Sequence, residues 1–264
     1  MTAPLSFRWL GDEAMHLDTP QITSVGPMLL GCYGGCVGAG ANKNEDAALL
    51  WYDPRGQWEC AIVVDAHHSA QSAALLVRVM LAEEHAIRRL LDLPVSSAFS
   101  GVQDHLVRVF SSAAFRAECV NIRGEASYLM LVRKGDFVWW FAVGDCVAYV
   151  LHPSLARLGE YALNQRKFYE WIGHVNTFDL PVPGWSSGVR QLRPGRNVIV
   201  LLTDGLLECG TRPFENPSML YYTFTWAAPT ITESINIALH RVHEEQGRDS
   251  ATIIAWAYDS TIQR

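Results

Sequence analysis

The sequence predicts a layered α+β domain built around a mostly antiparallel sheet. Candidate strands occur in blocks, and the candidate helices are grouped together instead of alternating with the strands. Short turn sequences join several of the strands, which favours antiparallel neighbours. With 264 residues, 49% of them hydrophobic and 18% charged, the chain is long enough to bury a substantial core. We therefore expect a single domain spanning residues 1–264.

Eight apolar runs bounded by turn residues predict strands. They are Met28–Tyr33, Ala47–Tyr52, Cys60–Val64, Ser127–Val132, Phe137–Val143, Val147–Leu151, Val198–Leu202 and Ala251–Tyr258. Three short turns, at 53–56, 133–136 and 144–145, connect successive runs. Each turn predicts a pair of neighbouring antiparallel strands.

Helical periodicity appears between residues 65 and 124 and again near the end of the chain. Apolar residues at Ala73, Val77 and Met80 lie on one face of a helix, and a second helix is expected after Ser96. A last helix is expected to begin at Thr230, where Thr-Ile-Thr-Glu has the pattern of a capping box.

Two segments lie outside this regular pattern. Residues 1–25 or so are expected to form a short N-terminal extension. Residues 155–196 are rich in Gly, Pro, Asn and aromatic side chains, and long irregular loops in compact domains often form lids or specificity elements. We therefore expect a flap-like segment beside the functional site.

Charge and hydropathy exclude several classes of partner. The net charge is -6 and no basic run occurs, so we expect no nucleic-acid binding. No apolar run reaches the length of a membrane span, and the first residues lack the pattern of a signal peptide. We expect a cytoplasmic protein without membrane contact, and the sequence gives no basis for an oligomeric state.

Acidic residues recur at the ends of the predicted strands. Glu45 and Asp46 precede one strand, Asp65 and Asp204 each follow one, and Asp249 precedes another. Carboxylates gathered at one sheet edge repel one another unless cations neutralise them, and such oxygen ligands suit magnesium or manganese. For any one Asp, the alternative is that it simply forms a turn.

Taken in order, five short motifs resemble those of the PPM-type (type 2C) protein serine/threonine phosphatases. The resemblance covers roughly residues 30 to 258, nearly the whole chain. The motifs are Asn44-Glu45-Asp46, Val63-Val64-Asp65-Ala66-His67, Ala142-Val143-Gly144-Asp145, Leu202-Thr203-Asp204-Gly205-Leu206 and Arg248-Asp249-Ser250-Ala251-Thr252. The resemblance implies two mostly antiparallel sheets packed face to face and flanked by helices, with two divalent cations in a cleft at the sheet edges.

By matching position, the resemblance also implies a set of metal ligands. Asp65 would bridge two manganese or magnesium ions, Asp204 and Asp249 would complete one site, and Glu45 with the backbone carbonyl of Ala66 would serve the other. Asp145 would help to hold a third, weaker ion.

The same resemblance implies a reaction. A hydroxide bridging the two ions would attack phosphoserine or phosphothreonine in a protein substrate, without a phospho-enzyme. Asp46 would orient the attacking water, and His67 would protonate the leaving oxygen. For His67, the alternative from its residue type alone is that it only flanks a turn.

Several positions depart from the family pattern. The usual glycine after the bridging Asp is Ala66, and an arginine that grips the substrate phosphate in many members is replaced by Ala41. Lys43 offers a point charge near this position but lacks the guanidinium fork. The segment Asn164–Lys167 supplies a second basic group, which we interpret as a candidate phosphopeptide contact.

These departures leave other functions open. One is a pseudophosphatase or regulatory module that binds a phosphoprotein partner with little turnover. Another is a phosphatase of bacterial partner-switching systems that acts on an anti-sigma-factor antagonist.

Overall fold

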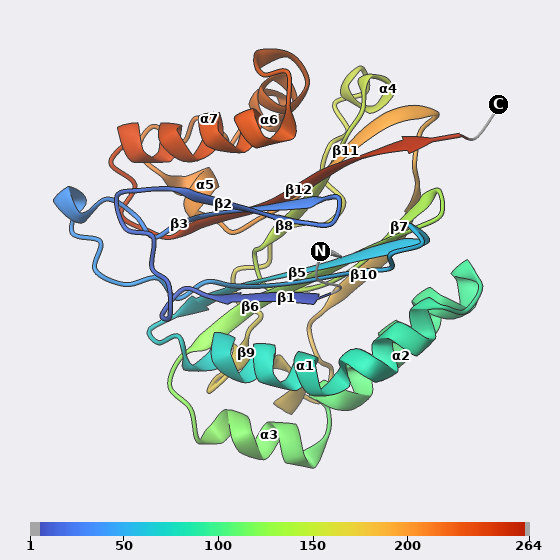
Figure 1. Cartoon of the computed structure of the whole chain (residues 1–264). Coiled ribbons are helices and arrows are strands. Elements are labelled where there is room, and N and C mark those ends of the chain that lie inside the picture. Colours follow the sequence, from blue (N-terminus) through green and yellow to red (C-terminus); the bar gives the residue numbers. More distant parts are fainter. Residues whose placement is uncertain (1–5, 262–264) are drawn as a thin grey trace.

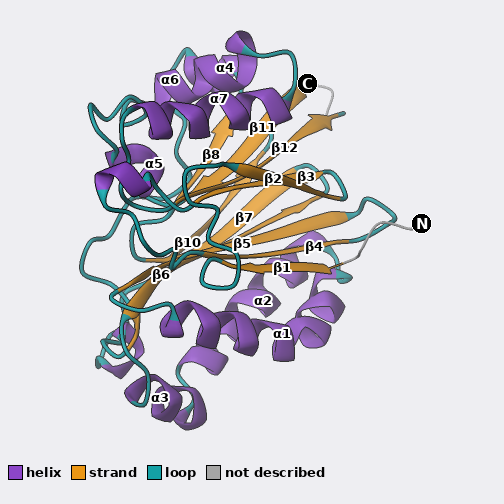
Figure 2. Cartoon of the chain, turned by 60° about the vertical axis from the view of Figure 1, so that its left-hand side comes forward, coloured by secondary structure: helices purple, strands orange, loops and turns teal. Residues whose placement is uncertain are grey.

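The computed structural model describes residues 6–261, which form two antiparallel sheets packed face to face between two layers of helices (Figures 1 and 2). All strand pairs within both sheets are antiparallel. The layered α+β architecture expected from the sequence is confirmed.

The first sheet has seven strands and the second has five. In spatial order, the first contains β1 (Ser6–Leu10), β4 (Ala47–Tyr52), β5 (Trp58–His67), β6 (Glu125–Lys134), β7 (Phe137–Val143) and β10 (Ser186–Gln191), with β9 (Ile172–Gly173) paired to β6. The second contains β2 (Gln21–Val25), β3 (Met28–Tyr33), β12 (Ala251–Ser260), β11 (Gly195–Leu202) and β8 (Val147–Leu151).

Helices cover the outer face of each sheet (Figure 1). The first sheet is covered by α1 (Gln71–Leu91), α2 (Val95–Phe110) and α3 (Ala113–Val120), and the second by α5 (Gly205–Glu208), α6 (Pro217–Tyr222) and α7 (Ile231–Glu244). The remaining helical segments are α4 (Pro153–Ala156), the 3-10 turns η1 (Val37–Ala39) and η2 (Thr177–Asp179), and the π-helical turn η3 (Thr223–Ala227). Within residues 6–261, none of the helices combines the length and apolar character needed to cross a membrane.

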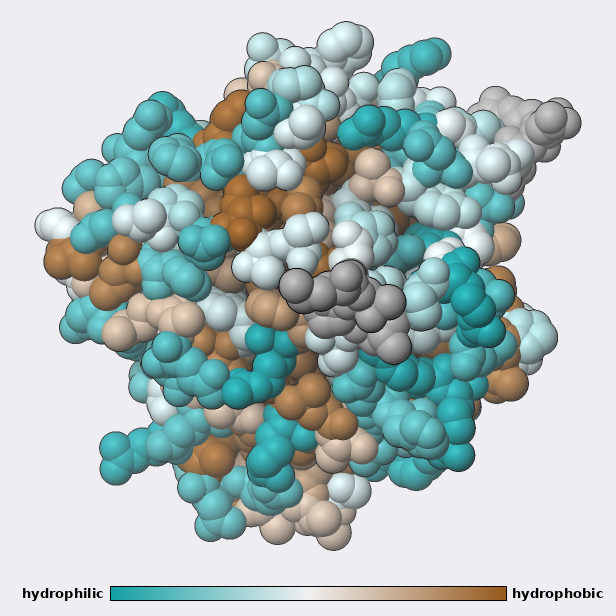
Figure 3. Space-filling model, viewed as in Figure 1, coloured by the Kyte–Doolittle hydropathy of each residue, from teal (hydrophilic) through white to brown (hydrophobic). Residues whose placement is uncertain are grey.

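Apolar side chains fill three layers of core. One layer lies between α1–α3 and the first sheet, a second lies between the two sheets, and a third lies between the second sheet and α5–α7. The surface in Figure 3 is mostly hydrophilic with separate apolar patches, which is ordinary for a globular protein. The layers hold both sheets firmly, so that side chains at the sheet edges are placed by a rigid scaffold.

Most of the predicted elements are present. All eight apolar runs form strands, although some strands extend beyond the predicted ends. The capping box of α7 is confirmed, because the Thr230 hydroxyl accepts a hydrogen bond of 3.2 Å from the backbone N–H of Glu233. The segment expected to be an N-terminal extension instead contributes β1 and β2, which pair with β4 and β3. These strands are only partly buried, so their sequences show little apolar pattern.

The turn at 144–145 was predicted to join neighbouring strands of one sheet, and this prediction was wrong. β7 belongs to the first sheet and β8 to the second, so the chain crosses between the sheets at Gly144-Asp145. Gly144 has φ +89°, and a Cβ there would lie 2.1 Å from Ser127 Oγ. Only glycine fits this crossing, which places the following Asp145 between the sheets.

Candidate metal centre and active site

Strand register brings the predicted acidic residues to one end of the two sheets. In the first sheet Ala47 pairs with Val64, so the preceding Asp46 and the following Asp65 emerge side by side. In the second sheet Leu202 pairs with Ile253, and Asp204 and Asp249 lie just beyond this pair. Four motifs that are far apart in the sequence therefore meet at adjoining sheet edges.

Asp46 is buried at the junction between the sheets. Its carboxylate accepts hydrogen bonds from the hydroxyls of Thr203 (3.1 Å), Ser250 (3.0 Å) and Thr252 (2.6 Å), all on the second sheet or beside it. Burial raises the pKa of Asp46 to about 7, the Thr252 hydroxyl opposes this shift, and the charge of Asp249 adds to it. Asp46 thus links the first sheet to the loops that carry the other carboxyl groups.

Asp65 is at the centre of the acidic cluster. Burial raises its pKa well above the ordinary range, and the charges of Asp46, Asp204, Asp249 and Asp145 raise it further. Burial also raises the pKa of Asp204 to about 6, together with the charges of Asp145 and Asp249. A hydrogen bond between the carboxyl groups of Asp65 and Asp204 partly opposes that shift. Five aspartates thus form one electrostatically coupled group without enough cations to balance them.

Asp145 joins this group from the crossing between β7 and β8. The Ser127 hydroxyl donates to its carboxylate, and the backbone N–H of Asp145 donates back to Ser127 Oγ at 2.9 Å. A carboxylate oxygen of Asp145 also lies within 4.8 Å of ligand atoms of Asp65 and His67, a spacing at which the three groups could hold an ion.

His67 lies next to the carboxyl groups of the acidic cluster. Its Nδ1 is 4.0 Å from Asp65 Oδ1, and its ring meets that of Trp171 edge to face at 5.0 Å between centroids. The neighbouring His68 points elsewhere and lies 3.2 Å from Glu125, with φ +68°. Of the two, only His67 lies beside the acidic cluster, and no local sequence pattern indicates its contact with Trp171.

Arg166 reaches the cluster from the segment predicted to be flap-like. Its guanidinium lies 2.6 Å from Glu208, 3.2 Å from Asp204 and 3.9 Å from Asp145. The sequence indicated a basic group in this segment but assigned it to the substrate. In the structure Arg166 pairs with Glu208 and Asp204, and so neutralises part of the acidic cluster.

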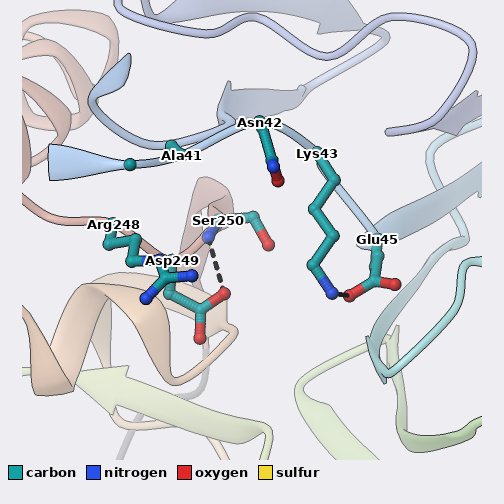
Figure 4. A pocket seen from close by; sticks show the side chains of 8 residues that line it. Ala41, Asn42, Lys43, Glu45, Arg248, Asp249 and Ser250 are labelled. Atoms are coloured by element: carbon teal, nitrogen blue, oxygen red, sulfur yellow. Dashed lines mark hydrogen bonds and ion pairs between the residues drawn. The ribbon is translucent and has the colours of Figure 1, made fainter. Parts of the chain in front are cut away.

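Glu45 lines a surface pocket of about 270 Å³ that Asp249 also lines. Glu45 and Lys43 lie on one side of this pocket and Asp249 and Arg248 on the other (Figure 4). Lys43, predicted to bind substrate, forms an ion pair with Glu45. Its ammonium group is thus already engaged by one of the predicted metal ligands.

The substitution of glycine by Ala66 is compatible with the backbone. Ala66 is part of β5 and pairs with Ala126 of β6, so its backbone is extended and does not need a positive φ. An alanine therefore fits, and its carbonyl stays at the strand end beside Asp65.

The chemistry of these residues fits two hard divalent cations. Carboxylate and carbonyl oxygens are the ligands that magnesium and manganese prefer. Burial, and then the charges of neighbouring carboxylates, raise the pKa values of Asp46, Asp65 and Asp204, and bound cations would favour the ionised forms of these groups.

These pKa shifts predict how metal and pH affect stability. Without metal, Asp204 and Asp46 have folded pKa values of about 6 and about 7, above the ordinary 3.8. Protonation therefore stabilises the fold, and this contribution is lost as pH rises from about 4 through 7. Metal binding needs ionised carboxylates, so manganese should stabilise more at pH 8 than at pH 5.

Thermal unfolding with chelator and with manganese at both pH values tests this prediction. Manganese at 100 times its Kd adds about 2.7 kcal/mol, or about 5 to 10 °C in Tm for a chain of this size. A Tm that rises with pH in chelator, or equal manganese effects at both pH values, would contradict the electrostatic description of the site.

Comparison with known proteins gives similarity in structure only. No family model matches the chain, and no curated protein matches it in sequence. A bacterial serine phosphatase superposes with a TM-score of 0.67 at 13% identity, over 89% of this chain and 99% of the other. The catalytic domain of the serine/threonine phosphatase PstP, in complex with two manganese ions, gives 0.58 at 14% identity, over 88% and 98%.

A third structure is PppA, a regulatory component of the type VI secretion system of Pseudomonas aeruginosa. It superposes with a TM-score of 0.57 at 17% identity, over 90% of this chain and all 100% of the other. Full-length coverage at such low identity establishes a common architecture. The chain therefore has the fold of the type 2C (PPM) serine/threonine phosphatases, as the resemblance of its motifs implied.

Proposed function

We propose that this chain is a metal-dependent phosphatase that hydrolyses phosphoserine and phosphothreonine in proteins, with residues 1–264 acting as one catalytic domain. The observation that carries the proposal is the gathering of Asp46, Asp65, Asp145, Asp204 and Asp249 at one end of the sheets. Asp46, Asp65 and Asp145 are buried and Asp204 is partly buried, whereas Asp249 is exposed at the rim. Several buried carboxylates so close together are unfavourable for folding alone, which favours a function that needs cations.

Glu45, Asp65, the carbonyl of Ala66, Asp204 and Asp249 would hold two divalent cations, with Asp145 available for a third. Their oxygen chemistry favours manganese or magnesium, and the similarity to the manganese complex of PstP supports manganese. When bound, such cations supply Lewis acidity, which lowers the pKa of water and balances the charge of phosphoryl oxygens.

The protein's own residues would position the attacking water and protonate the leaving oxygen. Three hydroxyl donors fix the carboxylate of Asp46. A carboxylate has about four acceptor positions, so Asp46 can still accept a hydrogen bond from the attacking water and orient it. His67, beside Asp65 and held by Trp171, would hold the proton that the serine or threonine oxygen takes up as the P–O bond breaks. Asp46 would therefore act on the attacking water, and His67 on the leaving oxygen.

The alternative function, a pseudophosphatase that binds a phosphoprotein with little turnover, has one specific observation in its favour. The guanidinium of Arg166 lies against the carboxylates of Asp204 and Asp145, which are predicted metal ligands. A fixed cation there would compete with a metal ion. Metal binding measured with and without this arginine therefore separates the two functions.

Loss of Asp204 tests the proposed reaction. Asp204→Asn keeps the size of the side chain but removes a charged ligand, so turnover of a phosphothreonine peptide should fall more than about 100-fold in manganese. Asp104→Asn, on the exposed face of α2, is the matched control and should keep full activity. Manganese binding by the wild type without turnover would favour the pseudophosphatase instead.

Removal of Arg166 should have the opposite effect on metal binding. Arg166→Ala leaves Asp204, Asp145 and Glu208 without their cation, so the metal-free protein should lose stability and manganese should bind severalfold more tightly. Titration calorimetry measures the affinity. The control is Arg190→Ala, which removes only an exposed pair with Glu160. If both variants bind manganese like the wild type, Arg166 does not compete with the metal.

A further inference from the structure

The pocket beside the acidic cluster contains an arginine that neither sequence nor family motif assigned to a role. Arg248 immediately precedes Asp249 and lines the pocket together with Ala41, Asn42, Lys43 and Glu45 (Figure 4). Arg248 is exposed, and among residues 6–261 its guanidinium has no ion-pair or hydrogen-bond partner. An arginine without a partner in a pocket lined by two predicted metal ligands is available for an anionic ligand.

The other two cations near the site are already engaged. Lys43 pairs with Glu45, and Arg166 pairs with Asp204 and Glu208. Arg248 can therefore bind a substrate without first breaking an ion pair. Its planar fork also matches the oxygen spacing of a phosphate, which the lysine ammonium does not.

The backbone leaves room for such a contact. Gly40 has φ +94°, and a Cβ at this position would lie 3.8 Å from Arg248 Nε. The guanidinium therefore lies close to the segment that ends in Ala41, whose short, buried side chain lines the pocket without filling it as a longer one would. The open space next to Ala41 faces the carboxylates of Glu45 and Asp249 (Figure 4).

The net charge of the pocket decides whether it can bind an anionic ligand. Without cations, Glu45 and Asp249 would repel an anion, and Arg248 alone would not outweigh them. With cations on these carboxylates, the pocket becomes positive and suits a dianionic phosphoryl group. A cation on Glu45 would also release Lys43 from its ion pair, adding a second positive group at the rim.

We propose that Arg248 binds the phosphoryl group of the substrate in this pocket, as a bidentate guanidinium contact that forms only when the neighbouring carboxylates hold cations. This assignment rests on the proposed phosphatase function. It makes Arg248 a substrate-binding residue that lies on the opposite side of the pocket from Lys43.

The test compares Arg248→Ala, Arg248→Lys and the control Arg89→Ala, an exposed arginine on α1 far from the pocket. Each protein is loaded with manganese, and two quantities are measured: the Ki of inorganic phosphate against a phosphothreonine peptide, and the Kd of phosphate by calorimetry. Arg248→Ala should raise both at least tenfold, equivalent to about 1.4 kcal/mol. The Ki and Kd of phosphate for Arg248→Lys should lie between those of the wild type and Arg248→Ala, because lysine keeps the charge and loses the planar fork.

Manganese affinity is the readout that separates binding from a structural effect. Arg248→Ala should bind manganese like the wild type, because its side chain is not a ligand. Unchanged phosphate affinity in Arg248→Ala, or a parallel loss of manganese affinity, overturns the assignment. If the wild type shows no turnover, the phosphatase proposal fails, while calorimetry still decides whether Arg248 binds phosphate in a metal-dependent way.

Discussion

The burial of a carboxylate between two sheets is the interaction on which the rest of the site depends. Asp46 precedes a strand of the first sheet and accepts hydrogen bonds from the hydroxyls of Thr252, in the second sheet, and of Thr203 and Ser250, just beyond its strands. Hydrogen bonds to a charged acceptor are strong when buried, and losing one leaves an unsatisfied group. This contact fixes the relative position of the loops that carry Asp65, Asp204 and Asp249.

The same arrangement creates an electrostatic conflict. Packing the sheets closely brings several carboxyl groups into a region that water reaches poorly, and each group makes its neighbours harder to ionise. In the metal-free chain, Arg166 relieves part of this repulsion at Asp204 and Asp145. The fold therefore offers a site for positive charge. Arg166 supplies part of it, and under the proposed function bound ions would compete with Arg166 for the oxygens of Asp204 and Asp145.

Sequence reasoning predicted the parts of this arrangement that depend on local pattern. The buried strands were recognisable because their apolar runs are long, and acidic residues at their ends located Asp65 and Asp204. The edge strands β1 and β2 were missed because they are half exposed and weakly patterned. The two short strands on either side of Gly144-Asp145 predict a hairpin, but β7 and β8 belong to different sheets, which only the packing of the sheets reveals.

The contacts of the basic residues depend on tertiary structure. Nothing local distinguishes Arg166, which pairs with residues about 40 positions away, from an exposed arginine in a loop. Arg248 likewise has no distinguishing local pattern. Its position in the same pocket as Ala41, more than 200 residues earlier in the chain, follows only from the tertiary structure. The role of a loop residue depends on the groups that the scaffold places near it, and the periodicity of the sequence does not predict these neighbours.

The most direct test of the account is diffraction from crystals soaked in manganese, with anomalous scattering used to locate the ions. The account predicts two manganese peaks between the sheets, one bound by Asp65, Asp204 and Asp249 and the other by Asp65, Glu45 and the carbonyl of Ala66. Arg166 should be displaced from Asp204. Crystals in which manganese is absent from these carboxylates, while Arg166 keeps its ion pairs, would contradict the claim that the fold is built around a metal centre.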